Sequence, residues 1–484
     1  MSKDYYITTT LPYVNADPHI GFALEIVQAD VLARYKKSEG FNVVFNTGTD
    51  EHGLKIYRRA VEEGKDPKKY VDEHAAKFEK LKKALNLSYT DFIRTTDPHH
   101  IKAAQKFWKL CDKNGDIYKK NYQIKYCVGC ELEKTESELV DNCCPIHPNL
   151  KLEIIEEENY FFRFSRYQDK LLQLYEKYPD FVVPDFRLNE IKQFVKGGLQ
   201  DFSISRVKEK LPWGVPVPGD ETQVMYVWFD ALINYISTLG WPFVADAPLI
   251  KPSKFELYWG TKEKPNAVQV AGKDNLRQQS AMWQAMLMSA GLPSSRKIMI
   301  HGFITSNGQK MSKSLGNVVD PYEVVEKYGT DALRYWLLAK ADPFEDSDFT
   351  WEKFKKDYNS DLANGLGNLV ARVAKLAEKI GFEVVQKTEI FDLSVKEKLE
   401  EYEFNEAIDI IWVDIAALDK RINEVQPWKL EEEKLKEFLS ETTVKIRSIA
   451  LSLKPFLPET AEKIEKQFTG SNIKSSQPLF PRAA

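Results

Sequence analysis

The sequence predicts an α/β fold in which a parallel sheet is split by a small cysteine-containing insertion and is followed by an all-α bundle. Two observations predict the sheet: strand-like and helix-like segments alternate near the start of the chain, and the alternation resumes after about residue 216. Helical periodicity without strand signals beyond about residue 320 predicts the bundle. A length of 484 residues accommodates such a layout, since it corresponds to roughly three domains.

The first strand, helix and strand predict one parallel unit. Residues 5–10 are β-branched and aromatic, residues 19–39 carry apolar side chains at helical spacing, and residues 41–45 form the second expected strand. Such a unit has a right-handed crossover. Open parallel sheets bind ligands beyond the carboxyl ends of their strands. We therefore expect a site in residues 11–18 and 47–53.

Changes in pattern along the chain divide it into five regions. The insertion interrupts the sheet pattern, with clustered cysteines and many charged residues, and the bundle is punctuated by prolines. We expect the first half of a split Rossmann-like domain over residues 1–114, the insertion over 115–215 and the second half over 216–320. A linker over 321–360 then leads to the helical bundle over 361–484.

Composition excludes several classes of protein. The formal net charge is −4, 43% of residues are hydrophobic and 29% are charged, which is the balance of a folded globular protein. A slightly acidic chain is not one that coats nucleic acid non-specifically, although a local basic surface can still bind one RNA. We find no apolar run of membrane-spanning length and no signal peptide, so we expect a cytoplasmic location.

Residues 18–21, Pro-His-Ile-Gly, follow the first strand and open a helix. The first turn of a helix offers unpaired N–H groups and the positive end of the helix dipole, which suit a phosphate. Gly21 has no Cβ, so a flat ligand can approach the backbone there. His19 can donate to a phosphate oxygen, although it could instead only cap the helix.

A second candidate segment, KMSKS, begins at Lys310 within a stretch flanked by glycines. Its two lysines, Lys310 and Lys313, are three residues apart with a hydroxyl between them. This arrangement suits a polyphosphate whose charge shifts in the transition state. The plainer alternative is a solvated basic loop.

Four of the five cysteines lie within 18 residues, at positions 127, 130, 143 and 144. Close ligand pairs on tight turns can form a tetrahedral Cys3His zinc site. We expect one structural zinc ion on Cys127, Cys130, Cys144 and His147. Cys143 is an alternative to Cys144 with less suitable spacing, and Cys111 is expected to be a small buried residue.

Together the PHIG and KMSKS segments resemble the signatures of class I aminoacyl-tRNA synthetases. The methionyl-tRNA synthetases are the most similar members, over essentially the whole chain. TTLPYVNADPHIG, TGTDEHG, MYVWFDALINY, GKDN and HGFITSNGQKMSKSLGN match segments of that family in order. The resemblance implies ATP-dependent ligation of L-methionine to tRNA(Met) through methionyl-adenylate, with release of AMP and pyrophosphate.

The resemblance also implies roles for particular residues. His19, Lys310 and Lys313 would be catalytic and would hold the phosphates of ATP, which Mg²⁺ accompanies. Gly21 would lie beneath the adenine, and Gly272 and Asp274 would hold the ribose. Because a carboxylate is already nucleophilic, adenylate formation would depend on positioning and electrostatics.

The methionine pocket follows from the same resemblance. Asp50 would pair with the α-ammonium group of the substrate. Aromatic rings suit a thioether, because sulfur contacts them favourably. The matching pocket residues are Leu11, Tyr13, Trp228, Ala231 and Tyr235, and Gln279 takes the place of a histidine found beside the sulfur in some members. Core packing is the alternative for the apolar residues.

The bundle resembles the family's anticodon-binding domain, and Asn368, Arg372 and Trp428 match its anticodon-reading positions. Arg372 could instead be a solvated charge, and Trp428 a core residue. The chain lacks the dimerising extension of some members, so we expect a monomer. One departure concerns Phe22, which stands where the first signature usually has a second histidine and cannot donate to a phosphate.

Two other functions fit parts of the sequence. A related class I synthetase or a nucleotidyltransferase shares the His-x-Gly device, but a plain nucleotidyltransferase would not need the bundle. A zinc-containing RNA-binding protein without catalysis is supported only by Phe22. Lys310, Lys313, Asp50 and Asp274 argue against that third possibility.

Overall fold

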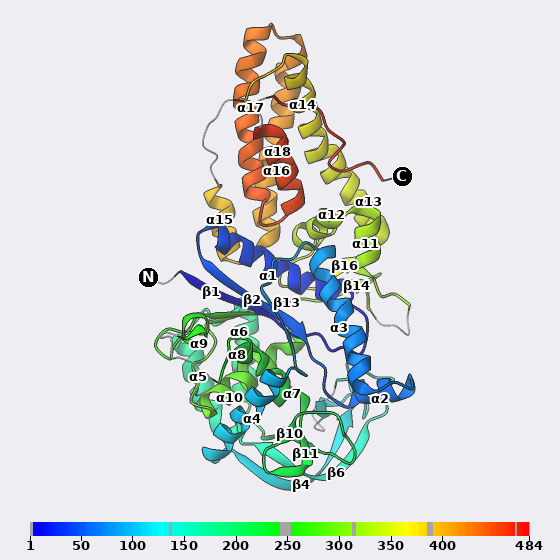
Figure 1. Ribbon diagram of the computed structural model, residues 1–484, viewed down its shortest axis with the longest axis vertical. Helices are drawn as coiled ribbons and strands as arrows, with labels where there is room; N and C mark the ends of the chain where they lie inside the picture. Colours follow the sequence, from blue (N-terminus) through cyan, green and yellow to red (C-terminus); the bar gives the residue numbers. More distant parts are fainter. Residues whose placement is uncertain are drawn as a thin grey trace. The chain divides into compact units, whose positions relative to one another are not determined.

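The computed structural model describes residues 3–130, 132–134, 138–242, 253–311, 316–384, 391–469 and 472–483. The chain divides into two compact units, which are described separately (Figure 1). Unit 1 comprises Met1–Asp17, Phe41–Lys80 and Tyr89–Ile300, and unit 2 comprises Pro18–Gly40, Leu81–Ser88 and His301–Ala484.

Unit 1 is built on a six-stranded sheet with the order β3-β2-β1-β12-β13-β7. The pairs β1–β2, β1–β12, β2–β3 and β13–β7 are parallel. The strands are β1 (Asp4–Thr9), β2 (Asn42–Thr49), β3 (Asp91–Arg94), β7 (Val182–Val183), β12 (Ala267–Gly272) and β13 (Lys297–His301). The parallel, split α/β domain is therefore confirmed. One edge strand, β7, comes from residues that we expected to lie in the insertion.

Two further sheets, with the orders β5-β4-β6-β8 and β10-β11-β9, are antiparallel. Strands β10 and β11 lie beyond residue 215, where we expected the insertion to end. The long strands β4 and β6 pair from Ile117↔Phe162 to Tyr126↔Glu153. The strands are β4 (Ile117–Cys127), β5 (Leu132–Lys134), β6 (Glu153–Phe162), β8 (Phe202–Ser203), β9 (Ser205–Val207), β10 (Pro216–Val217) and β11 (Asp220–Met225).

Aromatic side chains fill much of the core of unit 1. Phe107 stacks on Trp283 with ring centroids 5.7 Å apart, and it also contacts Phe229 and Trp241 edge-on. Such pairs add to the hydrophobic free energy of burial. The helical segments are α2 (Leu54–Glu62), α3 (Pro67–Ala84), α4 (Pro98–Lys113), η2 (Phe164–Tyr167), α5 (Gln168–Lys177), α6 (Asp185–Lys196), α7 (Val227–Ala231), α8 (Asn234–Ser237), α9 (Lys254–Tyr258), η3 (Lys273–Asn275), η4 (Gln278–Met282) and α10 (Trp283–Ser289).

Unit 2 contains a small three-stranded sheet that follows β13 along the chain. Strand β13 stops at His301, and a Cβ on Gly302 would lie 2.2 Å from the backbone of Glu345. This close approach breaks the strand. The chain continues as β14 (Ile304–Ser306), β15 (Gln309–Lys310) and β16 (Ser347–Phe349), in the order β15-β14-β16.

The rest of unit 2 is helical, and the all-α C-terminal region is confirmed. Two segments of this helical region, Trp336–Lys340 and Tyr358–Gly367, are π-helical, which residue helix propensities do not predict. The segments are α1 (Ile20–Ser38), α11 (Pro321–Tyr328), α12 (Thr330–Tyr335), η6 (Trp336–Lys340), α13 (Trp351–Asp357), η7 (Tyr358–Gly367), α14 (Asn368–Lys379), α15 (Leu393–Glu400), α16 (Phe404–Val425), η8 (Pro427–Lys429), α17 (Glu432–Leu453) and α18 (Pro458–Thr469). Within the described ranges, none of the helices is both long and apolar enough to cross a bilayer.

Candidate functional site

Three neighbouring strands of unit 1 end at the same edge of the main sheet. Leu11 and Tyr13 follow β1, Asp50 follows β2, and Gly272 ends β12. Since β1 lies between β2 and β12, these residues converge. Tyr13 and Asp50 also form an isolated parallel bridge, in which the Asp50 N–H donates to Pro12 O over 3.0 Å. The edge is where open parallel sheets bind ligands.

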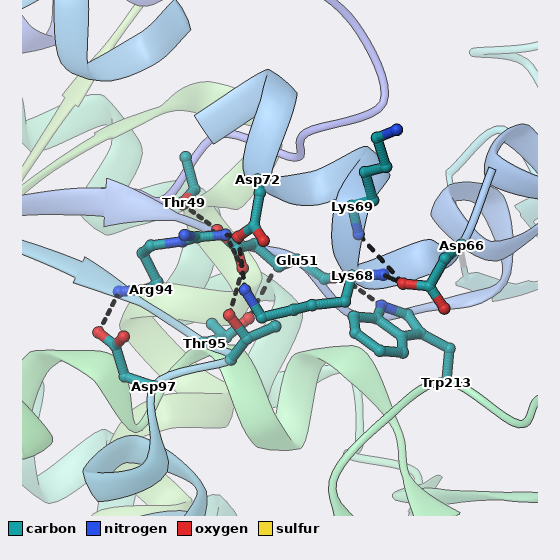
Figure 2. Close-up of polar contacts among 11 residues, drawn as sticks. Thr49, Glu51, Asp66, Lys68, Lys69, Asp72, Arg94, Thr95, Asp97 and Trp213 are labelled. Atoms are coloured by element: carbon teal, nitrogen blue, oxygen red, sulfur yellow. Dashed lines mark hydrogen bonds and ion pairs between the residues drawn. The ribbon is translucent and has the colours of Figure 1, made fainter. Parts of the chain in front are cut away.

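Glu51, the residue after Asp50, is the centre of a group of polar contacts (Figure 2). The buried Glu51 carboxylate accepts two hydrogen bonds from Arg94, over 2.6 Å and 3.0 Å, and one from Thr49 over 2.7 Å. The Glu51 carbonyl accepts from the indole N–H of Trp213 over 2.6 Å. A bidentate ion pair of this kind restricts the backbone on both sides. The backbone of Asp50, which is 7% exposed, is thereby fixed at the end of β2.

The aromatic residues predicted for the methionine pocket all lie in unit 1. Tyr13 and Trp228 pack against one small apolar cluster with Tyr226 and Val227. Ala231 ends α7, and Tyr235, four residues later, lies on the short helix α8. The predicted helical spacing of Trp228, Ala231 and Tyr235 is thus nearly retained, with a turn between the two helices. Tyr13, Trp228, Tyr235 and Asp50 belong to the same unit.

Gln279, predicted to lie near the substrate side chain, is beside Tyr235. Its Nε2 donates to the Tyr235 hydroxyl over 2.7 Å, and its Oε1 accepts from Gln269 Nε2 over 3.1 Å. All three side chains are at most 2% exposed. The hydrogen bonds of these buried side chains are therefore made within the protein.

A buried carboxylate anchors the helix that carries Trp228 and Ala231. Asp230 bonds His52 Nδ1 over 2.6 Å and His100 Nε2 over 2.9 Å. Burial alone would raise the pKa of Asp230, but the two histidines hold it at about 2. The carboxylate thus ties α7 to the segment after Asp50 and to α4. This group of three residues could not be predicted from the sequence, because its members are distant in the chain. Only the tripeptide at residues 50–52, Asp-Glu-His, hints at it locally.

The predicted ribose residues lie at the end of β12. Gly272 is buried, and Asp274 is exposed in the short helix η3. Asn275 Nδ2 donates to Asp274 Oδ1 over 3.4 Å. An exposed carboxylate at a strand's carboxyl end can accept hydrogen bonds from sugar hydroxyls.

In unit 2, His19 caps helix α1. Its Nδ1 accepts a hydrogen bond from the Gly21 N–H over 3.1 Å. Although the residue is exposed, the atoms packed around its ring, and then the charge of Lys310, lower the pKa of His19. A neutral imidazole that accepts at Nδ1 carries its proton on Nε2. Helix capping and phosphate donation are therefore compatible in one side chain.

Lys310 lies on β15, in a hairpin turned by Asn307 and Gly308. Both turn residues have positive φ, 53° and 71°, as a two-residue hairpin turn requires. The exposed Lys310 has its Nζ 5.5 Å from the centre of the Phe303 ring. Lys313 lies outside the described residues. Phe22 is half-buried on the first turn of α1 and offers no donor.

The predicted zinc ligands form one cluster. Ligand atoms of Cys127, Cys130, Cys144 and His147 all lie within 4.8 Å of one another. Cys130 Sγ is 3.1 Å from His147 Nδ1 and 3.4 Å from Cys144 Sγ. Three thiols and one imidazole in this arrangement fit a closed tetrahedral site. Cys143 is not a member of the cluster.

The fifth cysteine is a core residue, as expected. Cys111 has no exposed surface, and burial raises the pKa of its thiol to about 12. It remains a protonated thiol.

The structure brings two of the three predicted anticodon residues together. The Arg372 guanidinium lies 6.0 Å from the centre of the Trp428 ring, and Asn368 is one helical turn before Arg372 on α14. Trp428 is 49% exposed, so it is not a core residue. The guanidinium also donates to Asp419 over 2.6 Å and to Asn423 over 2.8 Å.

Asp419 and Asn423 were missed by the sequence analysis. They lie one turn apart on α16. The only feature of the sequence that could have identified them is a polar pair on a helix with an otherwise apolar face. Both line a cavity of about 570 Å³ between η7 and α16. They orient Arg372, because a guanidinium held from two sides loses little freedom when it meets a ligand.

Comparisons with known proteins agree with this geometry. The family described as "tRNA synthetases class I (M)" matches residues 5–151 and 133–374. A methionine–tRNA ligase of Thermotoga maritima is 40% identical over 98% of this chain and 77% of its own length. One of Thermosynechococcus vestitus is 41% identical over 99% and 93%. A solved structure of Mycobacterium tuberculosis methionyl-tRNA synthetase in complex with methionyl-adenylate has a TM-score of 0.89 at 36% identity, with 100% of both chains covered.

The split parallel sheet and the matched signatures define a class I tRNA synthetase. Within that class, the full-length similarity places the chain in the methionine–tRNA ligase family.

Proposed function

We propose that this enzyme activates L-methionine with ATP and transfers it to tRNA(Met). The proposal is supported by contacts among the predicted residues of unit 1: Asp50 bridges to Tyr13, Tyr13 and Trp228 pack on one apolar cluster, and Gln279 donates to Tyr235. A carboxylate pairs with an α-ammonium group, and aromatic rings suit a thioether. No other proteinogenic side chain combines an apolar chain of this length with a weak acceptor.

In the first step, the methionine carboxylate attacks the α-phosphorus of ATP, a new O–P bond forms, and pyrophosphate leaves. His19 donates from Nε2 to a phosphate oxygen, and Lys310 and Lys313 neutralise charge that moves onto the leaving group. No general base is required. Gly21 leaves room for the adenine, and Gly272 and Asp274 hold the ribose. Mg²⁺ bound with ATP would supply further charge neutralisation.

In the second step, a hydroxyl of the terminal adenosine of tRNA attacks the methionyl carbonyl, and AMP leaves. Asn368, Arg372 and Trp428 select the tRNA through its anticodon, with Trp428 stacking on an unpaired base. Cys127, Cys130, Cys144 and His147 would hold a structural zinc ion, which leaves no open position for substrate. We also propose a cytoplasmic, monomeric enzyme, which fractionation and sedimentation would test.

Amino-acid-dependent ATP–pyrophosphate exchange without tRNA tests the proposal. Methionine, leucine, isoleucine, valine, cysteine and homocysteine are offered separately. Exchange with methionine well above the others is expected, and it would also show that Phe22 is compatible with catalysis. Absence of exchange from a folded, metal-loaded sample would refute the proposal and favour a non-catalytic RNA-binding protein or an enzyme that needs tRNA bound first.

A further inference from the structure

A chain of buried hydrogen bonds runs behind the methionine pocket. It begins at Ser295, passes through Gln284, Gln269 and Gln279, and ends at the Tyr235 hydroxyl. None of the five side chains is more than 2% exposed. Water therefore does not compete for these hydrogen bonds, and each donor must find an acceptor within the chain.

The direction of the chain is set at its start by backbone groups. The Ser295 N–H can only donate, and it donates to Gln284 Oε1 over 3.0 Å. The carbonyl of Gln279 can only accept, and it accepts from Gln284 Nε2 over 2.9 Å. Both contacts orient the Gln284 amide the same way. Its Nε2 also donates to Ser295 Oγ over 3.0 Å.

Each later link passes this direction on. Ser295 Oγ receives from Gln284 and donates its own proton to Gln269 Oε1. Gln269 Nε2 then donates to Gln279 Oε1 over 3.1 Å. Gln279 Nε2 in turn donates to the Tyr235 hydroxyl over 2.7 Å. Because that oxygen receives an N–H from Gln279, the hydroxyl proton points away from Gln279.

We infer that Gln269 is a positioning residue for substrate specificity, acting through Gln279 on Tyr235. This inference rests on the proposed function, in which Tyr235 borders the methionine side chain. With the amides oriented as they are, Tyr235 presents an O–H donor to the substrate. A thioether sulfur accepts a weak hydrogen bond, whereas the methylene in the same place of norleucine accepts none. The chain therefore favours methionine over its isosteric hydrocarbon analogue.

The variant Gln269→Glu tests the inference, because its hydrogen-bonding depends on pH. The introduced carboxyl group can still donate to Gln279 while it is protonated, but the ionised carboxylate cannot. Ionisation would turn the Gln279 amide over, so that its Oε1 accepts from Tyr235 and draws the hydroxyl proton away from the substrate. Burial raises the pKa of a carboxyl group, often into the range of about pH 6 to 9.

The readout is the ratio of kcat/KM for methionine to kcat/KM for norleucine in pyrophosphate exchange, measured across that pH range. In Gln269→Glu we expect the ratio to fall about tenfold as pH rises, the usual effect of one lost hydrogen bond. The wild type should show no such fall. The matched control is Gln223→Glu. Gln223 is also buried and accepts from a serine hydroxyl over 2.7 Å, but it lies on β11 outside the pocket. Its ratio should follow the wild type.

Two further variants separate positioning from general damage. In a Tyr235→Phe background, Gln269→Glu should leave the ratio unchanged, since the hydroxyl it acts on is gone. If Gln269→Glu does not fold, Gln269→Met removes both polar ends at similar volume and should lower the ratio at every pH. A wild-type ratio in the folded variants, or an equal fall in the Phe background, would overturn the inference. Absence of methionine-dependent exchange in the wild type would instead refute the proposed function.

Discussion

His19 and Gly21 hold each other in place at the start of α1. The imidazole Nδ1 accepts from the Gly21 N–H over 3.1 Å, and a Cβ added to Gly21 would lie only 2.9 Å from His19 Cε1 and 3.0 Å from Nδ1. The absence of a side chain at Gly21 therefore matters for His19 itself. It leaves room for the imidazole orientation that keeps the Nε2 proton outward.

The first prediction concerns this pair. Gly21→Ala should displace the His19 ring and lower kcat for adenylate formation by about 10²-fold, the effect of misplacing one reacting group by roughly 1 Å. The KM for methionine should be unchanged. Pre-steady-state adenylate formation measures both. Gly197→Ala is the control, because its Cβ would meet its nearest atom at 3.4 Å. A wild-type rate in Gly21→Ala would contradict the arrangement.

Asp50 provides the second prediction. Asp50→Asn removes the negative charge but keeps the size, and it should raise the KM for methionine by about 10- to 100-fold, as expected for a lost hydrogen bond to a charged group. The KM for ATP should change little. Asp66→Asn is the control, since Asp66 lies outside the pocket and accepts from the N–H groups of Lys68 and Lys69. An unchanged KM for methionine in Asp50→Asn would contradict the proposed pairing of Asp50 with the α-ammonium group.

The third prediction is a pH dependence of stability. The pKa of the buried Asp230 is held at about 2, below its unfolded value of about 3.9. The carboxylate therefore contributes roughly 2 kcal/mol to the free energy of unfolding above about pH 4, and this contribution is lost as pH falls toward the folded pKa. Urea unfolding of wild type and Asp230→Asn should differ most near neutral pH and least in acid. A difference that does not vary with pH would argue against the two histidine contacts.

The fourth prediction addresses the metal cluster. A Cβ on Gly129 would lie 2.6 Å from His147 Cγ, so Gly129→Ala should push the imidazole out of the cluster. Zinc content by mass spectrometry should fall from about one ion per chain to well below it. Cys143→Ser should keep the full content, because Cys143 lies outside the cluster. Equal zinc in both variants would mean that His147 is not a ligand.

The fifth prediction concerns tRNA selection. Trp428→Ala should lower kcat/KM for tRNA by about 10- to 100-fold, in line with roughly 1–3 kcal/mol for stacking one base. Pyrophosphate exchange should be unaffected. Trp351, which is 37% exposed on another helix, gives the control Trp351→Ala. Loss of exchange in Trp428→Ala would indicate structural damage rather than lost recognition.

Local patterns in the sequence were sufficient to predict the parallel sheet, the bundle and the ligand sets. β-Branched and aromatic residues identify the strand near residue 5, helical spacing identifies the helix after His19, and the Cys127/Cys130 and Cys144/His147 pairs identify the Cys3His cluster, because each signal depends only on neighbours along the chain. The end of β13 before Gly302 could not be predicted in this way, because it is caused by the close approach of residue 345.

The sequence by itself determined the family, the strand end that carries Asp50, and the four residues of the Cys3His cluster. Only the tertiary structure decided which partners orient those residues. Asp230 meets His52 and His100 across 178 and 130 positions, and Gln279 meets Tyr235 across 44. Hydrogen-bond direction in a buried chain depends on three-dimensional neighbours and on which of them can only donate or only accept, and no local sequence pattern carries that information.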